Sequence, residues 1–238
     1  MYKIILSLMV FMLLLGCQQK RASENASDQN TASAADSGKR SFSFDPAAID
    51  RYMSKSADTM TVAVVKAKMG DIEIELFTND APKTTANFIG LSLAGYYNNV
   101  IFHRISRGYV LQGGDPTGTG AGGTSIYGET FEDELNPNTS SYREGYVRGV
   151  VAMANRGPNT NTSQFFIMLG NAPELPKAYT IFGRVINGMK VVDKIASDQI
   201  IPKLDQRDGT PVHPVSMEKV VIEKRERVKK PSSVFDAR

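Results

Sequence analysis

The sequence predicts a mainly β fold, a closed antiparallel barrel of about eight strands with two flanking helices outside it. Three observations lead to this prediction. Short runs of apolar residues alternate with polar ones at the period of half-buried strands, two segments carry a single apolar face at helical spacing, and loops rich in Gly, Asn and Pro separate them. A body of about 165 residues suits one domain.

The predicted elements begin with a hairpin, because apolar residues alternate with charged ones on both sides of Met69-Gly70. A helix is expected to open at Asp80-Ala81-Pro82 and to end at Gly95. A second helix is expected after Asn187-Gly188. The other strand candidates are short and apolar, and they cover 100–105, 109–112, 147–154, 164–169, 180–185 and 219–223.

The amino terminus is typical of a targeting segment. Lys3 precedes a dozen mostly apolar residues, a run too short to span a bilayer but suited to the core of a signal peptide. Leu14-Leu15-Gly16-Cys17 resembles the lipobox of bacterial lipoproteins. This resemblance implies that residues 1–16 are cleaved off, that Cys17 is lipidated, and that the protein is anchored to a bacterial membrane outside the cytoplasm. The alternative is an ordinary signal peptide with an incidental cysteine.

The segments that flank the body have distinct compositions. Residues 18–40 contain no aliphatic residue larger than Ala and no aromatic one, so 17–40 is predicted to be a disordered tether. Within 41–60, Asp45 and Pro46 are suited to the N-cap and first turn of a short helix. That helix is expected either to dock on the main domain or to contact a partner. Residues 229–238 are read as a C-terminal tail.

Composition excludes several classes of function. The chain has 28 Lys+Arg against 25 Asp+Glu, two His and one Cys. A lone thiol forms no intramolecular disulfide, and these residues do not make a four-ligand zinc site of His and Cys. No block of five like charges occurs, so nucleic acid is not an expected partner. No cofactor or metal is predicted, and a monomer is expected.

Two motifs are more specific than periodicity. The first is Phe-His-Arg-Ile at 102–105, followed by Gly-Tyr-Val-Leu-Gln-Gly-Gly-Asp-Pro at 108–116. The second is Met-Ala-Asn-Arg-Gly-Pro-Asn-Thr-Asn-Thr-Ser-Gln-Phe-Phe-Ile at 153–167. Together they resemble the cyclophilin family of peptidyl-prolyl cis/trans isomerases, and the resemblance extends over 61–228. It implies an eight-stranded barrel whose outer face carries a groove for proline-containing polypeptides.

The implied chemistry needs no covalent step. Rotation about an X-Pro bond has a barrier of about 18–20 kcal/mol, because the nitrogen lone pair is delocalised into the carbonyl. In the twisted amide the nitrogen becomes pyramidal and accepts a hydrogen bond, so a donor fixed beside it lowers the barrier. The permanently charged guanidinium of an arginine suits this role. Arg104 matches the catalytic arginine of the family.

The resemblance also supplies the rest of the site. Gln112 and Phe166 are assigned to catalysis with Arg104. The residues assigned to substrate binding are Tyr109, Val110, Gly120, Ala154, Asn155, Gln164, Leu175 and Tyr179. Strand alternation predicts that His103 points away from Arg104 as a hydrogen-bonded structural residue, and that Phe165 faces the core. Asp133 and Glu134 are expected to be solvated.

Several residues at the groove depart from the family pattern. Arg156 occupies a position that is commonly small, and Tyr179 stands where His is frequent. The chain has no Trp, and Glu174 aligns with the indole through which sensitive members bind cyclosporin. The favoured function is an isomerase that assists the folding of exported proteins. The alternative is a chaperone or scaffold module that binds proline-containing peptides with little turnover.

Overall fold

The computed structural model describes residues 42–53 and 56–227, without the side chain of Leu204. The predicted signal peptide 1–16, Cys17 with its tether 17–40, and the tail 229–238 lie outside the described residues. Within the described ranges, no helix is long and apolar enough to cross a membrane.

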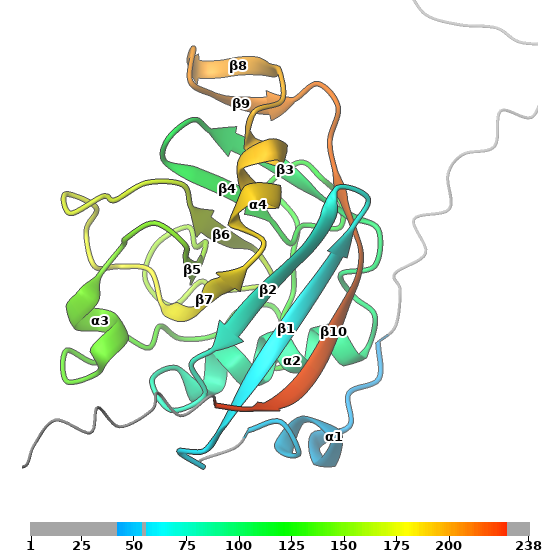
Figure 1. Ribbon diagram of the computed structural model, residues 1–238, viewed down its shortest axis with the longest axis vertical. Helices are drawn as coiled ribbons and strands as arrows, with labels where there is room; N and C mark the ends of the chain where they lie inside the picture. Colours follow the sequence, from blue (N-terminus) through cyan, green and yellow to red (C-terminus); the bar gives the residue numbers. More distant parts are fainter. Residues whose placement is uncertain (1–41, 54–55, 228–238) are drawn as a thin grey trace, which may run out of the picture. The chain divides into compact units, whose positions relative to one another are not determined.

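Eight strands of the described chain close into an antiparallel barrel, which confirms the predicted fold class (Figure 1). Going round the barrel, the order is β10-β1-β2-β7-β5-β6-β4-β3, and β10 closes the ring by pairing Ser216 and Met217 with β3. The strands are β1 (Thr59–Ala67), β2 (Gly70–Leu76), β3 (Val100–Ser106), β4 (Val110–Gly113), β5 (Val150–Met153), β6 (Phe165–Met168), β7 (Ile181–Asn187) and β10 (Ser216–Glu226). Each overlaps a predicted strand.

A further hairpin, β8 (Ile200–Asp205) and β9 (Asp208–Pro211), lies outside the barrel, at the top of Figure 1. It was not predicted, because Pro202 interrupts a short run that has no clear alternation. β9 extends the sheet beyond β3 by pairing Gly209 with Ile105 and Asp208 with Ser106. The hairpin therefore brings residues near 208 beside the strand that carries Arg104.

Helices α2 (Pro82–Leu93) and α4 (Met189–Ala196) are the two that the sequence predicts to flank the barrel, and α3 (Ser140–Glu144) is a short helix that was not predicted. α2 buries Phe88 against Phe165, with ring centroids 5.4 Å apart in an edge-to-face arrangement. Its N-cap, Ala81, offers no side-chain acceptor. Glu134 replaces that acceptor, because its carboxylate accepts from the backbone N–H groups of Lys83 and Thr84 at 2.9 and 2.8 Å. The expectation that Glu134 is merely solvated is therefore wrong.

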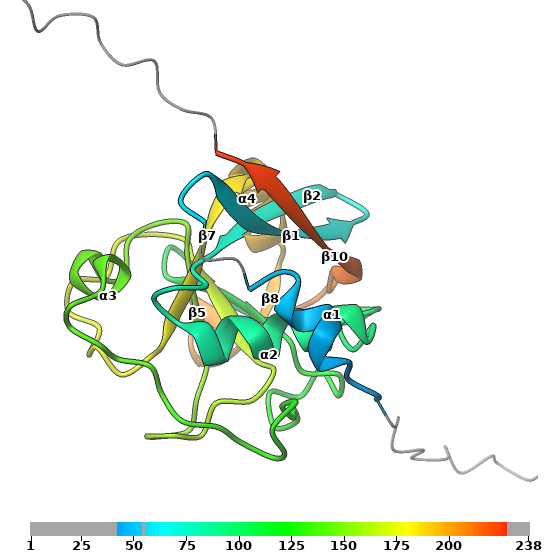
Figure 2. The same ribbon diagram turned by 90° about the horizontal axis from the view of Figure 1, so that it is seen from below.

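The short helix within 41–60 is α1 (Pro46–Asp50), and Asp45 caps it by accepting from the N–H of Ala47 at 3.0 Å. Its buried residue, Ile49, packs on α2 at Gly90, where an added Cβ would lie 2.9 Å from the Ile49 side chain. Figure 2 shows α1 beside α2. In this structure α1 packs on the body of the protein.

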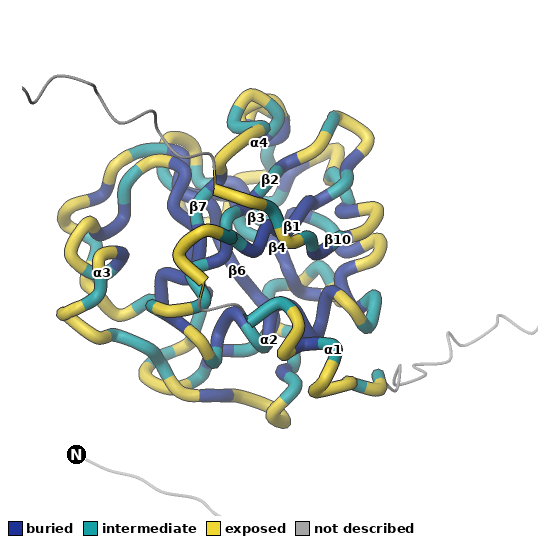
Figure 3. Tube along the Cα trace, turned by 60° about the horizontal axis from the view of Figure 1, so that its bottom comes forward, coloured by how far each residue is buried: buried dark blue, intermediate teal, exposed yellow. Residues whose placement is uncertain are grey.

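Burial follows the alternation of the strands. In β6, Phe165 and Ile167 join the main core inside the barrel, as predicted for Phe165, whereas Phe166 and Met168 belong to a second apolar cluster on the outside. Figure 3 shows the buried stretches concentrated in the barrel strands and α2. The second cluster forms an apolar floor on the outer face of the barrel, where the site lies.

Candidate active site

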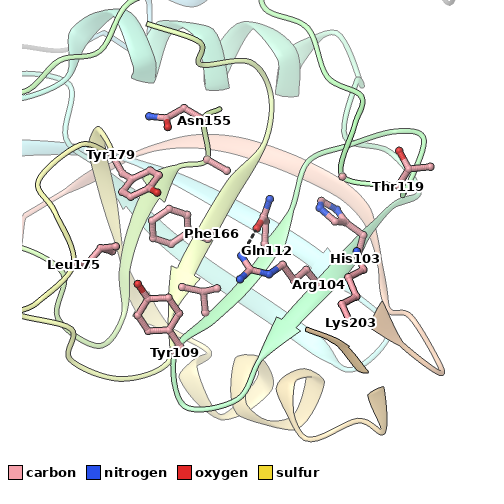
Figure 4. Close-up of a pocket in the computed structure, with 13 residues that line it drawn as sticks. His103, Arg104, Tyr109, Gln112, Thr119, Asn155, Phe166, Leu175, Tyr179 and Lys203 are labelled. Atoms are coloured by element: carbon pink, nitrogen blue, oxygen red, sulfur yellow. Dashed lines mark hydrogen bonds between the residues drawn. The ribbon is translucent and has the colours of Figure 1, made fainter. Parts of the chain in front are cut away.

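A cavity of about 400 Å³ opens on the outer face of β3, β4 and β6 (Figure 4). All the residues predicted for catalysis and substrate binding, except Gln164, line it. The residues that line it are His103, Arg104, Tyr109, Val110, Gln112, Thr119, Gly120, Ala154, Asn155, Phe166, Leu175, Tyr179 and Lys203. His103, Thr119 and Lys203 were not predicted to belong to the site.

One side of the cavity is an apolar slot. Phe166 and Val110 form its floor and are 5% and 3% exposed. The ring of Tyr179 stands edge-on to Phe166 at 5.6 Å, and Leu175 lies on the same side (Figure 4). Burial raises the pKa of Tyr109, whose hydroxyl is therefore neutral at physiological pH. The slot has an aromatic and aliphatic lining suited to a small apolar ring.

Arg104 and Gln112 lie on the other side of Phe166 (Figure 4). An Nη1–H of Arg104 donates to Oε1 of Gln112 at 3.0 Å, and Nε2 of Gln112 donates to Oε1 of Gln164 at 2.9 Å. Gln164 in turn donates to the carbonyls of Gly120 and Gly122 at 3.0 and 2.7 Å. Gln164 thus lies behind the slot, as the link between Gln112 and the glycine-rich loop.

The opposite edge of the guanidinium is held by Asp208. Nε of Arg104 lies 3.0 and 3.1 Å from the two carboxylate oxygens, and Nη2 lies 2.5 Å from Oδ2. The hydrogen bonds from Arg104 hold the pKa of Asp208 below its ordinary value, so this carboxylate is charged at neutral pH. Sequence reasoning missed Asp208 because it belongs to the unpredicted hairpin.

His103 departs from its predicted orientation. The β3–β4 register shifts between Phe102 and Arg104, so a β-bulge interrupts the alternation and His103 lines the same cavity as Arg104. The side chain is 2% exposed, and neither ring nitrogen has a hydrogen-bond partner among the described residues. Burial lowers the pKa of His103, so its imidazole is neutral. The prediction of a hydrogen-bonded residue on the opposite face is wrong.

The loop that carries Gly120 is organised around Asp115, which is fully buried. Its carboxylate accepts from the backbone N–H groups of Thr117, Gly120 and Gly122 at 2.8, 2.7 and 3.0 Å. Burial by itself raises the pKa of Asp115, but these hydrogen bonds and one from the Thr117 hydroxyl outweigh it and lower the pKa. The charged carboxylate therefore holds the Gly120 carbonyl in place for Gln164.

Replacing Asp115 with alanine is expected to lower the free energy of unfolding by about 2–4 kcal/mol, because loop N–H groups lose their acceptor. The pKa of Asp115 is lower in the folded protein than in the unfolded chain, where it is about 3.9. The contribution of Asp115 to the free energy of unfolding is therefore complete above the pKa of the unfolded chain, and it is lost as the pH falls through the pKa of the folded protein. Urea unfolding at pH 7 measures the first effect, and a pH series measures the second. Asp71→Ala, which removes an exposed partner of Lys66, is the control and should cost about 1 kcal/mol or less. Equal losses in the two variants would show that Asp115 does not hold the loop.

Hydrogen bonds from three further residues position the groove. Tyr146 accepts from the N–H of Tyr179 at 3.0 Å and donates to its carbonyl at 2.9 Å, so it fixes the loop that carries Leu175 and Tyr179. Asn155 donates to the carbonyl of Ala178 at 2.8 Å. Arg156, which lines a neighbouring cavity of about 200 Å³, donates to the carbonyl of Ala121. Sequence patterns alone did not single out Tyr146.

The chain matches the family described as "Cyclophilin type peptidyl-prolyl cis-trans isomerase/CLD" over residues 60–222. It is 54% identical over 127 residues to the chicken (Gallus gallus) peptidyl-prolyl cis-trans isomerase-like 3, covering 53% of this chain and 76% of that protein. It is 46% identical over 153 residues to an Arabidopsis thaliana peptidyl-prolyl cis-trans isomerase, covering 64% and 88%.

Solved structures support the same family assignment. A cyclophilin type isomerase of Cryptosporidium parvum is similar with a TM-score of 0.60 at 39% identity, over 69% of this chain and 98% of that one. The same protein was also solved in the presence of the dipeptide Ala-Pro. With the barrel, the groove and the family match in agreement, the chain belongs to the cyclophilin-type peptidyl-prolyl cis-trans isomerases.

Proposed function

We propose that this protein is a lipid-anchored isomerase that assists the folding of exported proteins, and that Arg104 catalyses rotation by donating a hydrogen bond to the prolyl nitrogen. The observation that carries the mechanism is the position of the Arg104 guanidinium beside the apolar floor formed by Phe166 and Val110. A proline ring seated on that floor places its nitrogen next to the guanidinium.

The proposed mechanism uses the N–H groups of Arg104 that bind no other residue of the site. Of its five N–H groups, Nε–H and one on Nη2 bind Asp208, and one on Nη1 binds Gln112. One N–H remains on each Nη atom. We assign one of them to the nitrogen of the twisted amide, which accepts a hydrogen bond only when its lone pair leaves conjugation. The donor therefore stabilises the transition state more than either planar isomer.

The substrate class is an X-Pro segment of an unfolded or extended chain. The Ala-Pro dipeptide used with the Cryptosporidium protein supports this assignment for a related groove. In this chain, Tyr109, Leu175 and Tyr179 enclose the ring, while Ala154, Asn155 and Gly120 line the path of the flanking peptide. The groove is open at the surface, as a polypeptide substrate requires.

The experiment that tests the activity follows cis-to-trans exchange of a short Ala-Pro peptide by NMR, without a protease, using residues 18–238. We expect substoichiometric protein to accelerate exchange, and Arg104→Ala to remove most of the acceleration. Peptide binding without acceleration would favour the alternative, a chaperone or scaffold module with little turnover.

The anchoring part of the proposal rests on the sequence. Lys3, the apolar run and Leu14-Leu15-Gly16-Cys17 together fit a lipoprotein signal, and Cys17 is the sole thiol of the chain. More than one acyl chain on Cys17 gives stable membrane attachment. The isomerase would then act on polypeptides that emerge on the outer side of that membrane.

Cys17→Ser is expected to abolish the incorporation of labelled palmitate and to release exported protein from the membrane fraction, because the acceptor sulfur is lost. Expression of the full chain in a bacterium, followed by labelling and fractionation, measures both effects. Gln18→Ser is the matched control and should label as the wild type does. Palmitate incorporation into the Cys17→Ser protein would refute the lipoprotein assignment.

A further inference from the structure

The β8–β9 hairpin contributes a charged side chain to the site. Asp208 stands opposite Ser106 in the β3–β9 pairing, and Ser106 is two residues from Arg104 on the same strand. Residues two apart on a strand share a face, so Asp208 is a diagonal neighbour of Arg104 across the two strands. The contact is therefore set by strand register, and it joins residues 104 positions apart in the chain.

The geometry of the contact restrains the guanidinium on two edges. Asp208 binds the edge formed by Nε and Nη2, and Gln112 binds Nη1 at 3.0 Å. A carboxylate that binds two adjacent N–H groups fixes the plane of the guanidinium as well as its position. The Arg104 side chain is 35% exposed, so packing alone does not immobilise it. The hydrogen bonds to Asp208 and Gln112 therefore restrain this long side chain.

The surroundings of the Arg104–Asp208 pair are compatible with a role for Asp208 in holding the guanidinium in place. The hydrogen bonds from Arg104 lower the pKa of Asp208, so the carboxylate stays charged beside the guanidinium. Lys203, on the same hairpin, also lines the cavity. The N–H groups that remain on Nη1 and Nη2 are not used by the ion pair.

We propose that Asp208 is a positioning residue for isomerisation, and that the β8–β9 hairpin is part of the active site because it holds the Arg104 guanidinium in its donating orientation. This inference rests on the proposed role of Arg104. Asp208 need not touch the substrate. Its loss should lower the rate at saturation while peptide affinity, which comes from the slot around Phe166, stays nearly unchanged.

The experiment is a double-mutant cycle in residues 18–238, with Asp208→Ala and Arg104→Ala alone and together. Exchange NMR at saturating Ala-Pro peptide measures kcat, and titration of the peptide measures Kd. We expect Asp208→Ala to lower kcat about 10- to 100-fold, the effect of misplacing a catalytic group, with Kd changed less than about twofold. In the Arg104→Ala background the same substitution should have no further effect.

Three further measurements exclude a merely structural role. Asp208→Glu keeps the carboxylate and should recover part of the lost kcat, whereas Asp208→Asn should recover less. The Nε–Hε resonance of Arg104 should become more mobile in Asp208→Ala. Asp193→Asn breaks a comparable exposed pair with Arg148, whose Nη2 lies 2.8 and 2.7 Å from the two carboxylate oxygens, and should leave kcat unchanged.

The outcomes separate the two proposals. Arg104→Ala with wild-type turnover would refute the proposed mechanism itself. Reduced turnover in Arg104→Ala together with normal or increased turnover in Asp208→Ala would overturn only the positioning role. An equal loss from Asp208→Ala with and without Arg104 would also overturn it, because the carboxylate would then act independently of the guanidinium.

Discussion

Replacing Arg104 with alanine is expected to lower kcat for an Ala-Pro peptide about 100- to 1,000-fold, the effect of removing a preorganised donor of about 2.7–4 kcal/mol. The physical reason is that planar prolyl amides offer no lone pair at nitrogen, so the hydrogen bond exists only in the twisted state. Peptide affinity should change little, because Phe166 and Val110 still form the slot. Exchange NMR with a peptide titration measures both quantities.

The control for this prediction is Arg148→Ala, which removes another ion-paired arginine that lies away from the cavity. Its turnover should equal that of the wild type. Urea unfolding of both variants shows whether either loses stability, since Arg104→Ala also leaves Asp208 without its partner. A near wild-type kcat for Arg104→Ala would mean that another group stabilises the twisted amide.

Cyclosporin is expected to bind this protein about 30- to 1,000-fold more weakly than it binds sensitive cyclophilins. By the family resemblance Glu174 is expected at the position of their indole, and it is exposed and directly precedes Leu175, which lines the cavity. An ionised carboxylate does not donate a hydrogen bond and resists desolvation under an apolar ligand. The lost hydrogen bond contributes about 0.5–1.5 kcal/mol and the lost aromatic burial about 1.5–3 kcal/mol. The two losses together give the expected fold-change in affinity, because a tenfold change in the dissociation constant corresponds to about 1.4 kcal/mol.

Titrating the inhibitor against turnover measures this effect, and Glu174→Trp provides the matched test. That variant should regain sensitivity while its turnover without inhibitor stays unchanged, because Glu174 does not line the cavity. Stoichiometric inhibition of the wild type at nanomolar concentration would show that a different group has replaced the indole, or that the alignment of the 173–179 loop is wrong.

Several features were predictable because they depend on local pattern. Alternation in 62–76 and in the short apolar runs marks each barrel strand, since the faces of a strand alternate wherever one side is buried. The positions of Arg104, Gln112 and Phe166 followed from family motifs, and the structure places these residues around one cavity. Their catalytic roles stay predictions.

The order of the barrel strands along the chain and the two larger helices could be predicted from the sequence, because each has a signal within a few neighbouring residues. The groove residues came from the family resemblance. Three other features depend on the tertiary fold. The register shift at His103 placed this residue on the wall of the cavity, Glu134 capped α2 from a position 50 residues away from Thr84, and strand register brought Asp208 to Arg104. These depend on distant backbones meeting in a particular register, which local periodicity does not encode.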